Sequence, residues 1–226
     1  MSIHTQIREQ LLGNLTAESA DKPAQLNVAG HESKSGNAMS AAIYFHPEAY
    51  TTTGPKLMGR NAAGESFLRG FFNYSQATEF WVQVDNLDYA QVFAKAAVGA
   101  GRNEPVKAVD KSSLVALSQP GLVYYPGPGI GEFAWQRALA GGRVGHCSWS
   151  LCGITHTTSS ARAMDALTNM LTAPVQPWDA VICTSTAVKN NVERLLQAHT
   201  DYLQDRLGIT KTVLPQLPVI PLGIHT

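Results

Sequence analysis

The chain has 226 residues, of which 44% are hydrophobic and 15% are charged, and its 17 Lys and Arg residues balance 17 Asp and Glu residues. This length and apolar content suffice for one α/β domain of ordinary size with an extension. A net charge of zero without any run of lysine or arginine gives no indication of binding to nucleic acid or to acidic lipid.

The N-terminal residues and the cysteines bear on the compartment. Arg8 and Glu9 lie among polar residues, without the apolar core of a signal peptide. No stretch approaches the roughly 18 consecutive apolar residues of a transmembrane helix. Three cysteines, an odd number, argue against a disulfide framework and for a reducing environment. We therefore expect a soluble, cytoplasmic protein.

Residues 1–39 read as an extension that precedes the folded domain. Four apolar residues at helical spacing predict one short amphipathic helix: Ile7, Leu11, Leu12 and Leu15. The stretch 21–40 is polar and contains glycine, and we expect it to be poorly ordered. The domain itself is predicted to span residues 40–226.

The domain opens with a strand, a loop and a helix. The apolar run Ala41–Phe45 has the length and composition of a buried strand. The segment His46–Gly59 contains two prolines and two glycines, which predicts a loop. One apolar face marks the helix that follows, formed by Ala63, Phe67, Gly70 and Phe71.

The rest of the domain continues to alternate strands with helices. Further strands are predicted at 80–84, 106–109, 121–125, 144–155, 179–183 and 217–222. Further helices are predicted at 85–100, 132–140, 159–171 and 186–207, with Met164 inward in the third of them. Strands that are apolar on both faces and alternate with helices indicate a mostly parallel sheet with helices on both faces. The expected fold class is therefore α/β and Rossmann-like.

Candidate ligand contacts follow from this topology. A helix that starts after a glycine-bearing loop offers unpaired amides and a favourable dipole to an anion, and Arg60 adds a cation directly after Gly59. His156 follows the strand that ends near Thr155, so it is expected at the same edge of the sheet. An ordinary βα connection and a capping histidine are the alternative interpretations.

Other motifs carry weaker signals. The turn Gly127–Gly131 lacks the G-x-G-x-x-G spacing, and Pro128 removes a backbone donor, so we interpret it as a turn rather than a phosphate cradle. Without that fingerprint and a ribose-binding acid, an NAD-dependent oxidoreductase is disfavoured. The histidines and cysteines of 146–156 match no standard zinc-ligand spacing, so no metal site is predicted.

Four stretches together resemble the N-terminal domain of family 4 retaining glycosyltransferases, which have the GT-B fold. They are IYFHPEAYTTTGPKLMGRNAAGESFLRGF, SLCGITHTTSS, WDAVICTSTAV and LPVIPLGI, in the order of the family. In that family two Rossmann-like domains face each other across a cleft. The resemblance implies that this chain is the acceptor-side half, and that the donor domain, with its paired glutamates, lies outside it.

The resemblance also assigns roles to residues. It implies that Gly59 and Arg60 lie near the donor diphosphate, although Gly59-Arg60 stands where a double glycine is often seen. His156 matches the family histidine that reaches the transferred sugar and is the expected catalytic residue. The acceptor is expected around His46, Glu48, Tyr50 and Thr53, for which loop solvation is an equally good explanation from the residues alone.

The expected function is therefore sugar transfer from a nucleotide-sugar to a hydroxyl acceptor with retention of configuration, as one half of a hexosyltransferase-like enzyme. The nucleotide-sugar is a substrate, and no cofactor is expected. We expect the half by itself to be inactive and to self-associate through its cleft face. The alternative is a stand-alone Rossmann-like binding or regulatory module.

Overall fold

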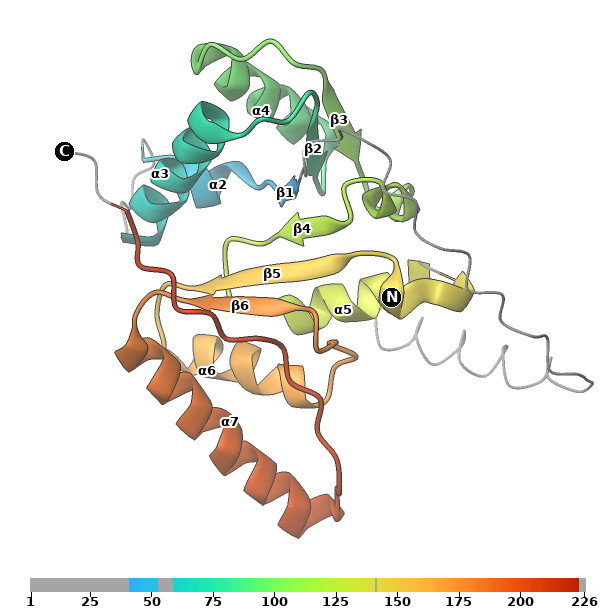
Figure 1. Ribbon diagram of the computed structural model, residues 1–226, viewed down its shortest axis with the longest axis vertical. Coiled ribbons are helices and arrows are strands. Elements are labelled where there is room, and N and C mark those ends of the chain that lie inside the picture. Colours follow the sequence, from blue (N-terminus) through green and yellow to red (C-terminus); the bar gives the residue numbers. More distant parts are fainter. Residues whose placement is uncertain (1–40, 53–58, 141, 224–226) are drawn as a thin grey trace, which may run out of the picture. The chain divides into compact units, whose positions relative to one another are not determined.

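The structure is a computed structural model that describes residues 41–52, 59–140 and 142–223. Six strands of these residues form one sheet, in which each strand runs parallel to its neighbours (Figure 1). In sequence order they are β1 (Ala42–Tyr44), β2 (Phe80–Gln83), β3 (Val106–Val109), β4 (Leu122–Tyr124), β5 (Ser150–Thr155) and β6 (Ala180–Cys183). The order across the sheet is β3-β2-β1-β4-β5-β6, which is the Rossmann order. The predicted fold class is confirmed.

Helices cover both sides of the sheet, because each parallel crossover must return over a face. The α-helices are α2 (Pro47–Tyr50), α3 (Gly59–Tyr74), α4 (Leu87–Gly99), α5 (Ile130–Ala140), α6 (Ala161–Thr168) and α7 (Thr186–Leu207). The 3-10 helices are η1 (Leu114–Ser118), η2 (Gly142–Cys147) and η3 (Asn169–Leu171). Figure 1 shows α2, α3 and α4 on one side and α5, α6 and α7 on the other.

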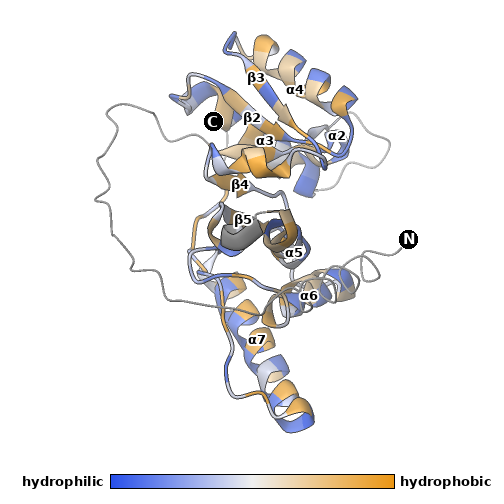
Figure 2. Cartoon of the chain, turned by 90° about the vertical axis from the view of Figure 1, so that its right-hand side faces the viewer, coloured by the Kyte–Doolittle hydropathy of each residue, from blue (hydrophilic) through white to orange (hydrophobic). Residues whose placement is uncertain are grey.

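Each side of the sheet has its own core. On the side of α3 and α4, Phe72 contacts both Phe80 and Phe93 edge to face, at ring-centroid distances of 5.4 and 5.2 Å. On the other side, Leu151 and Leu167 belong to a second buried cluster. Figure 2 shows hydrophobic residues concentrated on α3 and the strands, whereas α7 carries both hydrophobic and hydrophilic residues. The described residues belong to one unit, Ala38–Thr226, and the predicted extension 1–39 lies outside them.

The helix predicted at residues 186–207 is confirmed as α7, the longest of the described helices. Its N-cap, Ser185, accepts a hydrogen bond from the backbone N–H of Val188, and its C-cap, Gly208, is left-handed with φ 67°. Val192, Leu196 and Leu203 are its buried residues. The amphipathic stripe and the N-cap chemistry of Ser185 are the local signals that predict this helix.

Two predictions on helices were wrong in detail. The loop 46–59 contains the short helix α2, which packs so closely on α3 that a Cβ on Gly64 would lie 2.1 Å from the carbonyl oxygen of Ala49. The fully buried residues of α3 are Asn61, Gly64, Leu68 and Phe72, whereas the residues of the predicted face are half-buried, with Phe67 and Phe71 packed against the core. In α6, Met164 is exposed, and the expected helix 159–171 divides into α6 and η3.

Two predicted strands also differ from the structure. Residues 144–147 of the expected strand 144–155 belong to η2, and β5 begins at Ser150. The segment 217–222 forms no named strand but runs beside β6, where Cys183 donates to the carbonyl oxygen of Pro218 and Ile220 donates to that of Cys183. The prolines at 215, 218 and 221 have no backbone N–H to donate to a regular ladder of hydrogen bonds. The segment therefore pairs with β6 only through isolated bridges.

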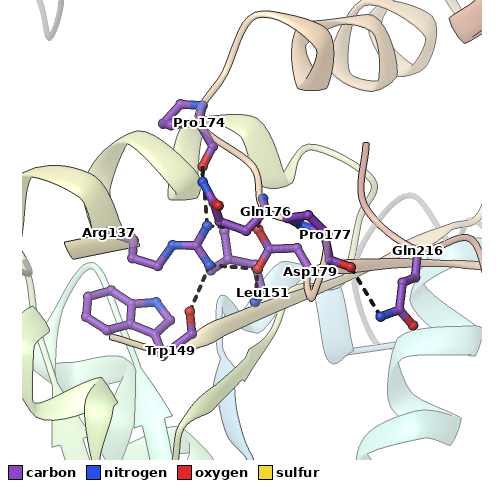
Figure 3. Close-up of polar contacts among 8 residues, drawn as sticks. All are labelled: Arg137, Trp149, Leu151, Pro174, Gln176, Pro177, Asp179 and Gln216. Atoms are coloured by element: carbon purple, nitrogen blue, oxygen red, sulfur yellow. Dashed lines mark hydrogen bonds and ion pairs between the residues drawn. The ribbon is translucent and has the colours of Figure 1, made fainter. Parts of the chain in front are cut away.

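A buried ion pair joins α5 to the strands β5 and β6 (Figure 3). The guanidinium of Arg137 donates to both carboxylate oxygens of Asp179, at 2.7 and 2.8 Å, and both side chains are 0% exposed. Arg137 also donates to the carbonyl oxygen of Trp149, while Asp179 accepts from the backbone N–H groups of Leu151 and Gln176. These bonds offset the desolvation of two charges.

None of the described helices is both long enough and apolar enough to cross a membrane.

The buried pair predicts a large loss of stability in Asp179→Asn. The substitution leaves the Arg137 guanidinium in the interior without a counter-charge, which costs about 3–5 kcal/mol in the free energy of unfolding. Glu65→Gln is the control, because it breaks the exposed ion pair with Arg69 and is expected to cost less than about 1 kcal/mol. Urea denaturation measures both, and similar losses for the two variants would contradict the prediction.

The contact between α2 and α3 predicts opposite effects for two glycines of α3. Gly64→Ala should lower the free energy of unfolding by about 1–3 kcal/mol, because backbone of α2 must move. At Gly70 a Cβ would meet no atom of the described chain within 4 Å, so Gly70→Ala should leave stability unchanged or raise it by up to about 1 kcal/mol. Equal urea midpoints for the two variants would show that α2 does not pack tightly on α3.

Candidate functional site

The strand order of the sheet reverses between β1 and β4, which are hydrogen-bonded neighbours. In open parallel sheets the loops after two such strands diverge to opposite faces and leave a crevice for a ligand at the carboxyl edge. Here the chain after β1 turns into α2 and then α3, whereas the chain after β4 turns into α5. We therefore built the candidate site from the residues that follow β1, β4 and the adjacent β5.

Gly59 and Arg60 are the first two residues of α3 and are both exposed. The first-turn amides of a helix have no partner within the helix, and the dipole there favours negative charge. A Cβ on Gly59 would come within 4 Å of no atom of the described chain. Packing within the described chain therefore does not demand glycine at this position, which leaves room for a ligand to approach the backbone.

His156 lies directly beyond the end of β5. The preceding residue, Thr155, is buried, and its hydroxyl donates to the carbonyl oxygen of Ile182 in β6 at 3.1 Å, which fixes the end of the strand. The ring of His156 is half-buried, and its Nε2 is covered without a hydrogen-bond partner in the described part of the chain. A buried polar atom without a partner is costly, so this nitrogen is a candidate ligand contact.

Arg60 and His156 act on each other electrostatically. Burial lowers the pKa of His156 below its ordinary value, and the positive charge of Arg60 lowers this pKa further. The structure therefore brings Arg60, the expected diphosphate residue, close enough to His156, the expected catalytic residue, for its charge to act on the imidazole, although 95 residues lie between them in the sequence. A neutral imidazole beside a cation suits hydrogen bonding to a ligand hydroxyl next to an anion.

The four expected acceptor residues have different environments. His46 precedes α2, and its ring contacts that of Tyr89 edge to face at 5.1 Å. Glu48 is exposed on α2. Tyr50 is 5% exposed and its hydroxyl donates to the carbonyl oxygen of Tyr44, so it is a core residue and its hydroxyl is already used. Thr53 lies outside the described residues.

The turn Gly127–Gly131 packs against β5. The carbonyl oxygen of Gly127 accepts from the backbone N–H of Ile154, and a Cβ on Gly153 would lie 2.6 Å from that oxygen. A Cβ on Gly131 would lie 2.2 Å from the side-chain oxygen of Asn169, which would have to move. Packing thus accounts for Gly153, where the close atom is backbone.

A polar cluster that the sequence analysis missed lies at the ends of β1 and β2. The hydroxyl of Tyr44 donates to Asp85 at 2.6 Å, and Lys111 forms an ion pair with the same carboxylate at 3.4 Å. Asp85 stands just after β2, which is the position of the ribose-binding acid in dinucleotide-binding domains. The signal was an acid directly after the apolar run Phe80–Val84.

Two surface hollows lie away from this edge. One of about 320 Å³ lies between α3 and α4 and includes Glu65 and Gly99. Another of about 430 Å³ lies beside Cys147 and Trp178, near the amino ends of β5 and β6. Among the described residues, no group of three or more His, Cys, Asp or Glu side chains could hold a metal ion. Within the described part of the chain, the carboxyl edge presents Arg60, His156 and the Asp85 cluster.

Neither a scan against models of protein families nor a search of curated proteins finds a match to this chain.

The lowered pKa of His156 predicts how the stability of the folded protein depends on pH. Because this pKa is lowered from 6.5, the folded protein keeps the imidazole neutral at a pH where the unfolded chain is protonated. Stability is therefore expected to fall as the pH decreases from 6.5 through the folded-state pKa of His156. Arg60→Gln removes one cause, so the His156 titration followed by NMR should move to higher pH.

Arg69→Gln is the control for this titration, because it removes an exposed arginine from the same helix. It should leave the midpoint of His156 unchanged. A midpoint at or above 6.5 in the wild-type protein, or one that Arg60→Gln does not raise, would contradict the arrangement of these two side chains.

Proposed function

We propose that this domain is the acceptor-side half of a retaining glycosyltransferase that moves a sugar from a nucleotide-sugar to a hydroxyl acceptor. One observation carries the proposal: Arg60 at the start of α3 and His156 at the end of β5 act on each other at the carboxyl edge of a Rossmann-ordered sheet. The resemblance of the sequence to family 4 assigned the diphosphate and the sugar to these two positions, and the geometry supports that assignment.

The residues present suit the charges that such a reaction develops. Cleavage of the donor places negative charge on the leaving diphosphate and positive charge on the sugar ring. The amides of the first turn of α3 and the guanidinium of Arg60 would stabilise the diphosphate. The Nε2 of His156, which has no hydrogen-bond partner among the described residues, would form a hydrogen bond with a hydroxyl of the transferred sugar. Catalysis would then rest on positioned donors and cations rather than on a protein nucleophile.

The rest of the enzyme would come from a second domain. In the proposal that domain holds the nucleotide and supplies the further cations and carboxylates of the donor site. His46 and Glu48 remain acceptor-side candidates, whereas Tyr50 is withdrawn because its hydroxyl is used inside the core. Self-association through the cleft face and a cytoplasmic location, which the three free cysteines favour, remain part of the proposal.

A second candidate function has its own supporting observation. Asp85 follows β2 in a sheet of the order 3-2-1-4-5-6, which is the arrangement that binds the ribose of a dinucleotide. A self-contained nucleotide-binding module would use this acid. The sequence after β1 has no G-x-G-x-x-G, so we rank this function second.

Turnover by the complete product of the gene tests the proposal. Incubation with nucleotide-sugars and a hydroxyl acceptor should release nucleoside diphosphate, and His156→Ala should lower kcat by roughly 10²-fold or more. Gly59→Ala should raise the KM for the donor, because a Cβ would hold the diphosphate away from the amides. Gly70→Ala, in the same helix, is the control and should behave like the wild-type enzyme.

Two results would count against transfer. Diphosphate release that is unaffected by His156→Ala would remove this residue from the mechanism. Tight binding of NADH or another dinucleotide, lost in Asp85→Asn and kept in His156→Ala, would favour the second candidate function instead.

A further inference from the structure

Side chains from three neighbouring strand ends meet beside the proposed donor site. Tyr44 is the last residue of β1, Asp85 lies two residues after β2, and Lys111 lies two residues after β3. The Tyr44 hydroxyl donates to one Asp85 oxygen at 2.6 Å and the Lys111 ammonium pairs with the other at 3.4 Å. Asp85 is 38% exposed and Lys111 is 71% exposed, so solvent or a ligand reaches this group.

An acid and an aromatic wall complete the group from α5. Glu132 is exposed in the first turn of that helix, and its charge acts on Tyr44. The ring of Phe133 lies 5.0 Å from that of Tyr44 and stacks on Tyr125 at 3.7 Å. The Tyr125 hydroxyl is itself held by the side-chain oxygen of Gln83 at 2.9 Å, so the wall is fixed in position.

The protonation of Tyr44 decides what it offers to a ligand. Burial, followed by the hydrogen bond to Asp85 and the nearby negative charges, raises the pKa of Tyr44. The phenol therefore keeps its proton and donates a hydrogen bond to Asp85. The lone pairs of the phenol oxygen and the remaining lone pairs of the carboxylate are left as acceptors for a ligand. Lys111 supplies donors beside them.

A role in stability explains this group poorly. Exposed ion pairs contribute about 0–1 kcal/mol, so the pair of Asp85 and Lys111 stabilises the fold little. Tyr44 ends β1, and Phe133 lies in α5, which follows β4, so the group includes residues from both sides of the reversal of strand order, the place where Rossmann-like sheets bind ligands. Carboxylates, an ammonium and an aromatic face together match adjacent hydroxyl groups on a ring that also has an apolar face.

We propose that Tyr44, Asp85, Lys111 and Glu132 form a subsite for the adjacent hydroxyl groups of a sugar, whose ring lies near Phe133. The two carboxylates accept from the hydroxyls and Lys111 donates to them. The inference deepens the proposed function and rests on it in one respect, namely that this sugar is the acceptor. The acceptor of the reaction is then a carbohydrate.

The position of this sugar subsite suits the transfer. One strand, β4, separates β1 from β5, so the strands that carry Tyr44 and His156 are two strand spacings apart, about 10 Å. Ile43 pairs with Tyr124 and Tyr124 with Cys152, so His156 also lies three residues, about 10 Å, beyond the level of Tyr44 along the strand direction. A ring bound beside Tyr44 and a donor sugar held at His156 would thus both fit along this part of the edge.

Ligand-observed NMR on the whole chain tests the subsite with D-glucose and sucrose as probes. Saturation transfer to their ring protons is expected at millimolar concentration, and cyclohexanol, a ring with one hydroxyl, should receive less. Asp85→Asn should weaken sugar binding by about tenfold or more, because a hydrogen bond to a charged group is lost. Tyr44→Phe, which keeps the ring packing, should weaken it several-fold.

Asp205→Asn is the matched control, because it removes an exposed acid from α7 and should leave sugar binding unchanged. Backbone amide spectra that match the wild type will show that each variant is folded. Absence of binding of both sugars, or equal binding by Asp85→Asn and the wild type, would overturn the proposal. Binding of adenosine that depends on Asp85 and exceeds that of the sugars would assign the hydroxyl contacts to a ribose and overturn the acceptor assignment.

Failure of the sugar subsite and failure of the proposed transferase function would give different results. Sugar binding that depends on Asp85, in a protein whose gene product transfers no sugar, would keep the subsite and reject the transferase. Transfer that depends on His156, with an acceptor KM that Asp85→Asn leaves unchanged, would reject the subsite and keep the transferase.

Discussion

The carboxylate of Asp179 fixes how the second half of the sheet is assembled. It binds the Arg137 guanidinium of α5 through two hydrogen bonds and accepts backbone N–H groups from Leu151 in β5 and from Gln176. The carbonyl oxygen of the same residue accepts from Gln216, which aligns the last segment beside β6. One buried charge pair thus sets the relative positions of a helix, two strands and a terminal segment. Removal of either charge would leave the other uncompensated in the interior.

The position of His156 in the candidate site depends on this assembly, because β5 and β6 are held at both of their ends. Asp179 holds their amino ends, and Thr155, bonded to Ile182, holds their carboxyl ends just before His156. On the other half of the sheet, α2 packs closely against α3 at Gly64, and Arg60 lies in the first turn of that helix. Arg60 and His156 are therefore positioned by different contacts, those between α2 and α3 and those between β5 and β6.

Much of the fold could be predicted because the deciding signals are local. The stripe and caps of α7 lie within its own sequence, and the apolar runs of the strands mark a buried parallel sheet. Gly59, Arg60 and His156 were placed at one edge because parallel strands share their carboxyl ends. The rest depends on contacts between distant segments: Tyr50 is buried because its hydroxyl reaches the backbone of β1, and α2 forms where turn residues indicated a loop. The cluster of Tyr44, Asp85 and Lys111 forms only because β3, β2 and β1 are neighbours in this order, and the periodicity of apolar residues along the sequence does not indicate strand order.

The central claim is that the start of α3 and His156 form one anion- and sugar-binding wall. Titration of the isotope-labelled chain with uridine diphosphate and guanosine diphosphate, followed by amide and imidazole NMR shifts, tests it most directly. The account predicts that the largest shifts occur at the amides of Gly59, Arg60 and Asn61 and at the ring of His156. Shifts centred instead on Asp85 and the turn at Gly127–Gly129, or no shifts at millimolar concentration, would contradict it.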